Sequence, residues 1–118
     1  MAGDRMKPQS LPKRMIIKSK KEMAHVFKTA PLKQGELLTL YHLKKPKTGT
    51  RFAFVCDRGI KKATERNRLK RIMREIFRAE KNKFLNQETI FLARQTAVGK
   101  TFWQIKEDFV RLMSPGQN

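Results

Sequence analysis

The chain has 118 residues, which is enough for one domain with a single modest hydrophobic core and too few for a second. Its 28 Lys and Arg side chains outnumber its 10 Asp and Glu side chains, and the resulting formal charge of +18 favours a polyanionic partner. Because no apolar run approaches the roughly 18 residues of a membrane-spanning helix and no secretory segment follows Met1, we expect a cytoplasmic protein without a membrane partner. The single cysteine, Cys56, agrees with a reducing compartment.

Composition divides the chain into a tail, a domain and a short end. Residues 1–12 are polar, contain two prolines and show no periodicity, so they are predicted to form a flexible basic tail. Residues 13–113 are predicted to form the single domain, and residues 114–118 a flexible C-terminus.

The first helix is predicted to begin after Ser19. Ser19 and Glu22 have the spacing of a capping box, in which a hydroxyl and a carboxylate satisfy two free backbone amides. Pro31 ends the helix. Its apolar face carries Met23, Val26, Phe27 and Ala30.

Three segments are predicted to be strands. Residues 36–43 and 51–56 are rich in strand-forming side chains, and the turn residues at 44–50 between them predict a hairpin. Residues 89–94 form a third strand. A closing helix runs from Thr101, which forms a second capping box with Gln104, to Met113.

The central helix, predicted at 64–81, is amphipathic and strongly basic. Thr64 is expected to cap its first turn, where Glu65 complements the helix dipole. Its apolar stripe consists of Leu69, Ile72, Met73, Ile76 and Phe77. The opposite side carries Asn67, Lys70, Arg71, Arg74, Arg78 and Lys81.

A basic helix face is usually a solvated surface, but acids that would balance the charge are scarce here. Between Arg58 and Lys83 the only acids are Glu65, Glu75 and Glu80, against eleven Lys and Arg. Self-repulsion at that density destabilises the fold unless an anion lies opposite, so we interpret this side as a polyanion-binding face.

The pattern of acids and histidines favours a binding protein over an enzyme acting alone. Metal-dependent nucleases cluster carboxylates, whereas the acids here are scattered, and the adjacent pair Glu107 and Asp108 is interpreted as solvated surface. His25 and His42 have no partner at zinc-ligand spacing, and no phosphate-binding glycine loop occurs. Phe27 and Tyr41 could stack on unpaired bases, although Phe27 is equally compatible with a core position.

These elements predict an α/β (α+β) two-layer sandwich. It would contain one mixed sheet of about four strands with three helices, in the order α-β-β-(β)-α-β-α.

The segment 63–78, ATERNRLKRIMREIFR, closely resembles the signature of the bacterial ribonuclease P protein subunit. The family pattern is an Arg-Asn-Arg core followed by Lys-Arg, Arg-Glu and Phe-Arg pairs. Here it is matched by Arg66, Asn67, Arg68, Lys70, Arg71, Arg74, Glu75, Phe77 and Arg78. The order of elements and the chain length are also similar to the family over residues 11–113.

The resemblance implies a protein without catalytic residues in a ribonucleoprotein enzyme. A large RNA would perform the Mg²⁺-dependent hydrolysis that removes the 5′ leader from precursor tRNA, with one protein bound per RNA subunit. The fold would include a left-handed βαβ crossover through the central helix. Residues implied to bind the catalytic RNA are Arg58, Lys61, Lys62, Arg66, Asn67, Arg68, Lys70, Arg71 and Arg74. Residues implied to bind the single-stranded leader, between the first helix and the sheet, are Lys13, Arg14, Met23, Phe27 and Tyr41.

Two positions depart from the family pattern. Met23 stands where relatives often have an aromatic residue, and Asp57-Arg58 replaces a pair of lysines. Asp57 therefore places a negative charge where the resemblance implies a contact to a phosphate or a hydrated metal ion. The expected consequence is either a changed affinity for the leader or a carboxylate that helps to hold a hydrated cation. Two alternatives stay open, namely a general RNA-binding or ribosome-associated protein, and a free-standing nuclease.

Overall fold

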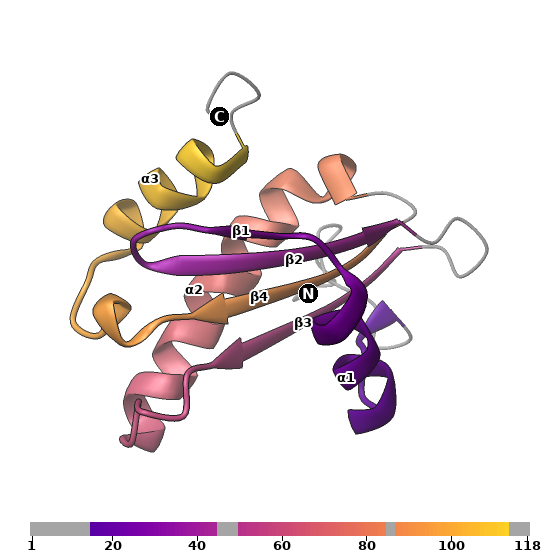
Figure 1. The fold of residues 1–118 in the computed structure, drawn as a ribbon. Coiled ribbons are helices and arrows are strands. Elements are labelled where there is room, and N and C mark those ends of the chain that lie inside the picture. Colours follow the sequence, from indigo (N-terminus) through magenta and orange to yellow (C-terminus); the bar gives the residue numbers. More distant parts are fainter. Residues whose placement is uncertain (1–14, 45–49, 85–86, 114–118) are drawn as a thin grey trace, which may run out of the picture.

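The computed structural model describes residues 15–44, 50–84 and 87–113 (Figure 1). The predicted tail at 1–12, the leader candidates Lys13 and Arg14, and the C-terminus at 114–118 lie outside these residues. In chain order the elements are α1 (Lys20–Thr29), β1 (Leu32–Gln34), β2 (Leu38–Lys44), β3 (Arg51–Cys56), α2 (Ala63–Glu80), the 3-10 helix η2 (Lys81–Phe84), β4 (Gln87–Ala93), the 3-10 helix η3 (Gln95–Ala97) and α3 (Phe102–Met113).

The four strands form one mixed sheet in the order β1-β2-β4-β3. The last strand, β4, occupies an inner position, antiparallel to β2 and parallel to β3. The predicted hairpin between residues 36–43 and 51–56 is therefore wrong, since β4 separates the two strands. The burial of consecutive residues from Glu88 to Phe91 in β4 explains its inner position, because an inner strand covered on both faces need not alternate polar and apolar side chains.

The edge strand β1 was not predicted. Its three residues are all exposed, so they carry no periodic signal, and they are ordered by pairing with Thr39 to Tyr41 of β2.

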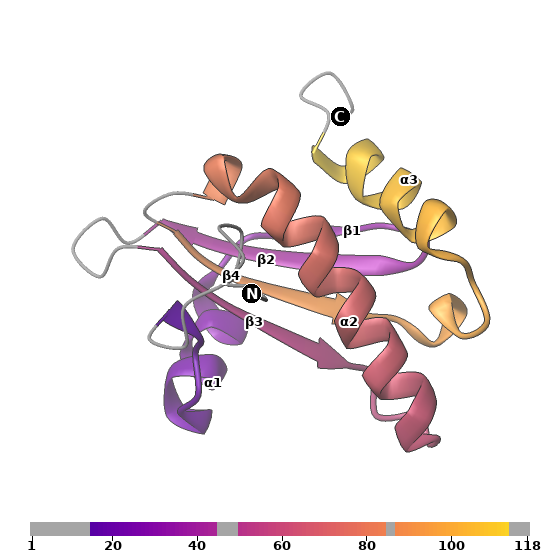
Figure 2. The ribbon, with the colours of Figure 1, turned by 180° about the vertical axis from the view of Figure 1, so that it is seen from behind.

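Helices cover both faces of the sheet, with α2 and α3 on one face and α1 on the other (Figures 1 and 2). The predicted apolar stripe of α2 is confirmed, because its five residues are all buried. They pack with Phe52, Phe84, Phe91 and Phe109 in the main core. A smaller cluster lies under α1 and contains Ile17, Val26, Ala30, Ala53 and Ile90.

The connection from β3 through α2 to β4 is left-handed. In Figure 2, α2 lies in front of the sheet, and β4 lies to the left of β3 when both strands are turned to point upward. Most parallel βαβ units have the opposite hand. The crossover expected from the family resemblance is thus present.

The helix starts agree with the sequence predictions at two of three positions. The Ser19 side chain accepts hydrogen bonds from the amides of Lys21 and Glu22, and Thr101 and Gln104 bond each other as a complete capping box. The expected Thr64 cap is wrong, because α2 already begins at Ala63 and the Lys62 carbonyl accepts the Arg66 amide. Within the described part of the chain, no helix has both the length and the apolar content needed to cross a membrane.

Candidate nucleic-acid interface

The loop that leads into α2 is shaped by Asp57. Its Oδ1 accepts hydrogen bonds from the Gly59 amide at 2.8 Å and from Nε2 of Gln95 at 3.1 Å. These bonds, that of Gly59 foremost, hold the pKa of Asp57 below its usual value. A Cβ at position 59 would lie 1.9 Å from Gln95 Nε2, so glycine is needed for this close approach. Asp57 therefore stabilises the conformation of this loop in the free protein.

Arg66 fastens the same loop to the helix. One guanidinium nitrogen donates to the carbonyl of Ile60 at 3.0 Å and to that of Lys61 at 2.9 Å. Ile60 is itself buried in the main core. The side chain of Arg66, assigned to the catalytic RNA by resemblance, thus presents the backbone that carries Lys61 and Lys62.

Arg68 is held by Glu65 in a two-bond ion pair, with distances of 3.0 and 2.7 Å. Glu65 also accepts the Gly99 amide at 2.8 Å, so the pair ties the start of α2 to the turn before α3. The Arg68 contact, followed by that of Gly99, lowers the pKa of Glu65 to about 2, and Glu65 in turn raises the pKa of Arg68. Arg68 has a positioning role besides any contact with RNA.

The remaining candidates on this helix point outward. Lys70 is half-buried and the other candidates are exposed. Arg74 also lies over the Phe54 ring, 5.7 Å from its centroid. None of the basic residues in this set forms an ion pair with another described residue. We call this set the α2 basic surface, consisting of Arg58, Lys61, Lys62, Asn67, Lys70, Arg71 and Arg74.

The far end of α2 is different, because its cations have acidic partners. Arg78 pairs with Glu75, and Lys83 of η2 pairs with Glu80 at 3.1 Å. In this part of the described chain, the cations without an ion-pair partner therefore lie between Arg58 and Arg74.

On the other face of the sheet, the structure brings three leader candidates together. The Phe27 and Tyr41 rings meet edge to face with centroids 4.8 Å apart, and Met23 and Tyr41 both pack on the small cluster under α1. Phe27 is 38% exposed, which is more than its interpretation as a core residue allows. We call Met23, Phe27 and Tyr41 the α1 aromatic site.

An ion pair that the sequence did not reveal fixes α1 against the sheet. Arg51, the first residue of β3, binds both carboxylate oxygens of Glu22 at 3.0 and 2.8 Å and lies 3.6 Å from the buried Glu88. The bond to Glu22 raises the pKa of Arg51. No local pattern signals this contact, since its partners come from three different elements.

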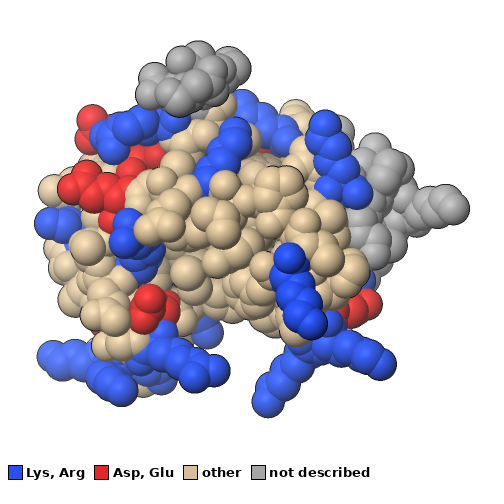
Figure 3. Space-filling view, in the orientation of Figure 1, with Lys and Arg blue, Asp and Glu red and all other residues tan. Residues whose placement is uncertain are grey.

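The interface is basic at its margins and carries no metal cluster. Seen from the α1 side, Lys and Arg gather along the lower edge of the molecule, where α1 and the start of α2 lie, and neutral surface fills the centre (Figure 3). No group of three or more His, Cys, Asp or Glu side chains among the described residues is placed to hold a metal ion.

Comparison with known proteins gives consistent results. A model of the Ribonuclease P family matches residues 11–115. The ribonuclease P protein component of Syntrophomonas wolfei is 28% identical over 104 residues, which cover 87% of this chain and 87% of the relative. That of Chlamydia pneumoniae is 25% identical over 112 residues, covering 94% and 81%. The solved RNase P protein from Thermotoga maritima superimposes with a TM-score of 0.71 at 27% identity, covering 81% of this chain and 92% of that one. The Staphylococcus aureus RNase P protein shares the fold, with a TM-score of 0.76 at 23% identity and coverage of 83% and 91%.

Proposed function

The chain belongs to the ribonuclease P protein family, and on this premise we propose that it is the protein subunit of ribonuclease P, the endonuclease that removes the 5′ leader from precursor tRNA. The observation that carries the proposal is the α2 basic surface. Its members on α2, Asn67, Lys70, Arg71 and Arg74, match the family motif. No basic residue of the surface forms an ion pair with another described residue. A cytoplasmic location accords with this role.

The α2 basic surface is proposed to bind the catalytic RNA. Exposed cations neutralise phosphates and release counterions. Arg58, Lys61 and Lys62 precede the start of α2, where the backbone dipole also favours anions, and Lys70, Arg71 and Arg74 continue the surface along the helix. Arg66 and Arg68 support the surface by fixing the preceding loop and the turn at Gly99.

The α1 aromatic site is proposed to bind the single-stranded leader. Phe27 and Tyr41 offer ring faces and edges to unpaired bases, and the thioether of Met23 adds a polarisable apolar contact. Arg51 keeps α1 in place through Glu22, so the site is formed before RNA arrives.

Mg²⁺ is proposed to act on the RNA side of the complex. Mg²⁺ prefers octahedral oxygen ligands, and the described residues offer no such cluster. Asp57 is the one candidate for a contact to a hydrated cation, although its Oδ1 already accepts two hydrogen bonds. The protein's contribution would be to reduce repulsion between two RNAs and to hold the leader.

Reconstitution tests the proposal. A bacterial ribonuclease P RNA and precursor tRNA are combined at low Mg²⁺ with and without the chain. We expect cleavage at the leader junction to require the RNA and to be accelerated by the protein. No acceleration, at protein concentrations that saturate RNA binding, would favour a general RNA-binding protein. Cleavage by the protein with Mg²⁺ alone would favour a free-standing nuclease.

A further inference from the structure

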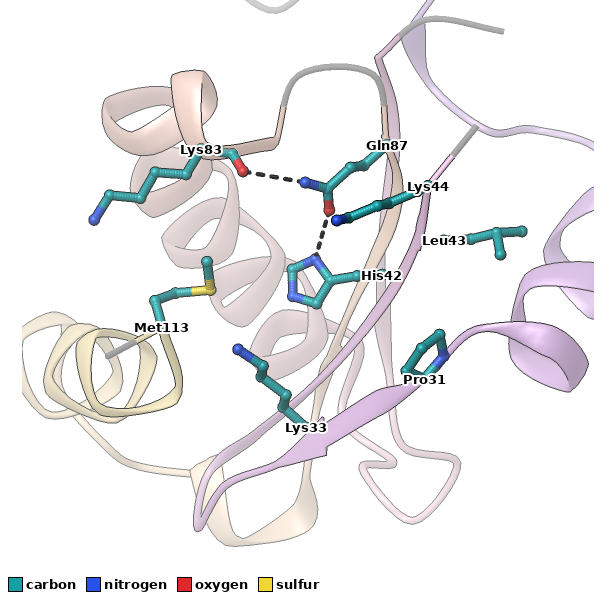
Figure 4. Close-up of a pocket in the computed structure, with 8 residues that line it drawn as sticks. All are labelled: Pro31, Lys33, His42, Leu43, Lys44, Lys83, Gln87 and Met113. Atoms are coloured by element: carbon teal, nitrogen blue, oxygen red, sulfur yellow. Dashed lines mark hydrogen bonds between the residues drawn. The ribbon is translucent and has the colours of Figure 1, made fainter. Parts of the chain in front are cut away.

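A pocket of about 530 Å³ lies at the end of the sheet opposite the start of α2 (Figure 4). It is lined by Pro31, Lys33, His42, Leu43, Lys44, Lys83, Gln87 and Met113. Its volume falls within the range of about 300–1,000 Å³ that is common for small-molecule sites. The pocket is separate from the α1 aromatic site, because His42 stacks on Phe84 of the main core whereas the preceding residue, Tyr41, contacts Phe27 on the other face.

The lining combines positive charge with apolar surface. Three lysines, Lys33, Lys44 and Lys83, are among the described lining residues, none of which is acidic, and the Lys83 ammonium points away from His42 (Figure 4). Lys83 pairs with Glu80 at 3.1 Å, whereas no ion pair with a described residue involves Lys33 or Lys44. Pro31 and Met113 supply the apolar part, whereas the Leu43 side chain points toward α1 (Figure 4). A suitable ligand is therefore an anion with a flat or apolar body.

His42 is the polar group at the centre of this lining. Its ring stacks on Phe84 with centroids 5.5 Å apart and planes 4° from parallel. Gln87 donates from Nε2 to the Lys83 carbonyl at 3.4 Å, which turns its Oε1 toward His42 Nδ1 at 3.2 Å. Nδ1 therefore carries the proton in the neutral ring. The other nitrogen, Nε2, is buried and has no hydrogen-bond partner among the described residues, which is unfavourable for a polar atom.

We propose that this pocket binds a nucleotide, with its phosphate held by Lys33 and Lys44 near the His42 ring and its base against Pro31 and Met113. The nucleotide could be free or part of an unpaired RNA strand, since both present the same phosphate and base. The inference is independent of the proposed function, because it is tested by binding to the protein alone.

Binding is coupled to protonation of His42. Burial, opposed by the Gln87 hydrogen bond and assisted by the positive charge of Lys33, lowers the pKa of His42 in the free protein. A phosphate in the pocket opposes this lowering, because its negative charge favours the imidazolium form of His42. The nucleotide complex takes up as much as one proton, so affinity increases as pH falls. Lys33 is the charged group that acts on the ring, and the other charged residues of the described lining, Lys44 and Lys83, are also cations.

Two methionines allow the pocket and the α1 aromatic site to be observed in one experiment. Met113 lines the pocket and Met23 belongs to the α1 aromatic site. Protein labelled with ¹³C at the methionine methyl groups is titrated with the dinucleotide UpU, whose phosphodiester does not titrate near neutrality, and separately with adenosine 5′-monophosphate. UpU with a methylphosphonate linkage is the uncharged control. We expect the Met113 signal to shift with the charged ligands and not with the control.

Variants and pH complete the test. Lys33→Ala with Lys44→Ala should weaken the Met113 response at least tenfold, whereas Lys20→Ala with Lys28→Ala, an equal loss of charge on α1, should not. Lowering the pH from 7.5 to 5.5 should increase UpU affinity several-fold in the native protein, and His42→Gln should abolish that dependence.

A response to adenosine monophosphate alone would assign the pocket to a free nucleotide, and a response to UpU would assign it to an RNA strand. No Met113 shift with either ligand at millimolar concentration, or equal binding by the two double variants, would overturn the proposal.

Discussion

Asp108 shows how one side chain can fix the geometry of a distant segment. Its carboxylate accepts backbone hydrogen bonds from Glu36 at 3.2 Å and from Leu37 and Leu38 at 3.0 Å each, where the chain turns into β2. A Cβ at Gly35 would lie 2.5 Å from Oδ2, so the turn closes tightly on this carboxylate. The interpretation of this acid as solvated surface is wrong, because its exposure is only 2%.

Loss of this carboxylate should lower stability substantially. Asp108→Ala leaves three backbone amides without an acceptor, and since each buried unsatisfied donor loses about 1–3 kcal/mol, we expect the free energy of unfolding to fall by roughly 3 kcal/mol or more. Asp108→Asn keeps one side-chain oxygen as an acceptor, so its free energy of unfolding should lie between those of the native protein and Asp108→Ala. Urea denaturation measures the difference. The neighbouring Glu107→Ala is the control, and a similar loss in both alanine variants would contradict the role assigned to Asp108.

The contrast between Leu69 and Asp108 shows which residues sequence can place. Leu69 belongs to a stripe repeated every three to four residues, so the helix itself specifies its burial. Asp108 is buried because it meets amides 70 to 72 positions away. Arg51 likewise depends on acids from two other elements. Such contacts form only when distant segments meet in the fold, so no periodic pattern in the sequence predicts them.

At the scale of elements, the two sides of α2 have different roles, one in the core and the other in the proposed binding of RNA. The apolar side fills the main core, while the outward cations run from the loop before the helix start to Arg74. Several of them, such as Lys61 and Lys62, lie close to the helix start. Positive side chains are unfavourable there, because the helix dipole already places partial positive charge at the N-terminus. Glu65 offsets part of this effect, with the pKa of its carboxyl lowered to about 2 by Arg68 and Gly99. The positive charge that Glu65 does not offset can be paired by a phosphate from outside the protein.

A salt series distinguishes direct phosphate contact from a general charge effect. Arg71 is exposed on α2, and Lys20 is exposed at the start of α1 on the opposite face of the sheet. Removing one phosphate contact should reduce the slope of log K against log salt for catalytic RNA binding by about 0.7–0.9. We expect this reduction for Arg71→Ala and almost none for Lys20→Ala. Equal slopes for the two variants would show that Arg71 contributes only net charge.

The sequence predicted the positions of the strands better than the way in which they pair and connect. The segments predicted as strands at 36–43, 51–56 and 89–94 overlap β2, β3 and β4, because β propensity is local. Their pairing is not local, and turn residues between two strands fit a hairpin and an open connection equally well. The left-handed crossover came from family resemblance, since the general rule for βαβ units predicts the opposite hand.

For the whole molecule, the sheet separates the two proposed binding surfaces. The α2 basic surface and the α1 aromatic site belong to helices on opposite faces (Figures 1 and 2). With a formal charge of +18, the molecule can neutralise phosphates on both sides. Such an arrangement allows one small protein to lie between a large RNA and the leader of its substrate.

This separation predicts that the two activities can be lost independently. In a series of precursor tRNAs with lengthening leaders, affinity for the holoenzyme should rise over the first few unpaired nucleotides and then level off. Phe27→Ala should remove much of that gain, since stacking on one base contributes about 1–3 kcal/mol, and should leave binding to the catalytic RNA unchanged. Arg71→Ala should weaken assembly and, once the complex is saturated, preserve the length dependence.

The double variant Phe27→Ala with Arg71→Ala decides whether the partition holds. Distant sites without shared partners usually show additive effects within about 0.3–0.5 kcal/mol, so we expect the two losses to add in both assays. Val110→Ala, which removes exposed apolar surface from α3, is the control for nonspecific effects. A coupling well above this limit would mean that the leader and the catalytic RNA share one continuous surface, and the sheet would then not separate their sites.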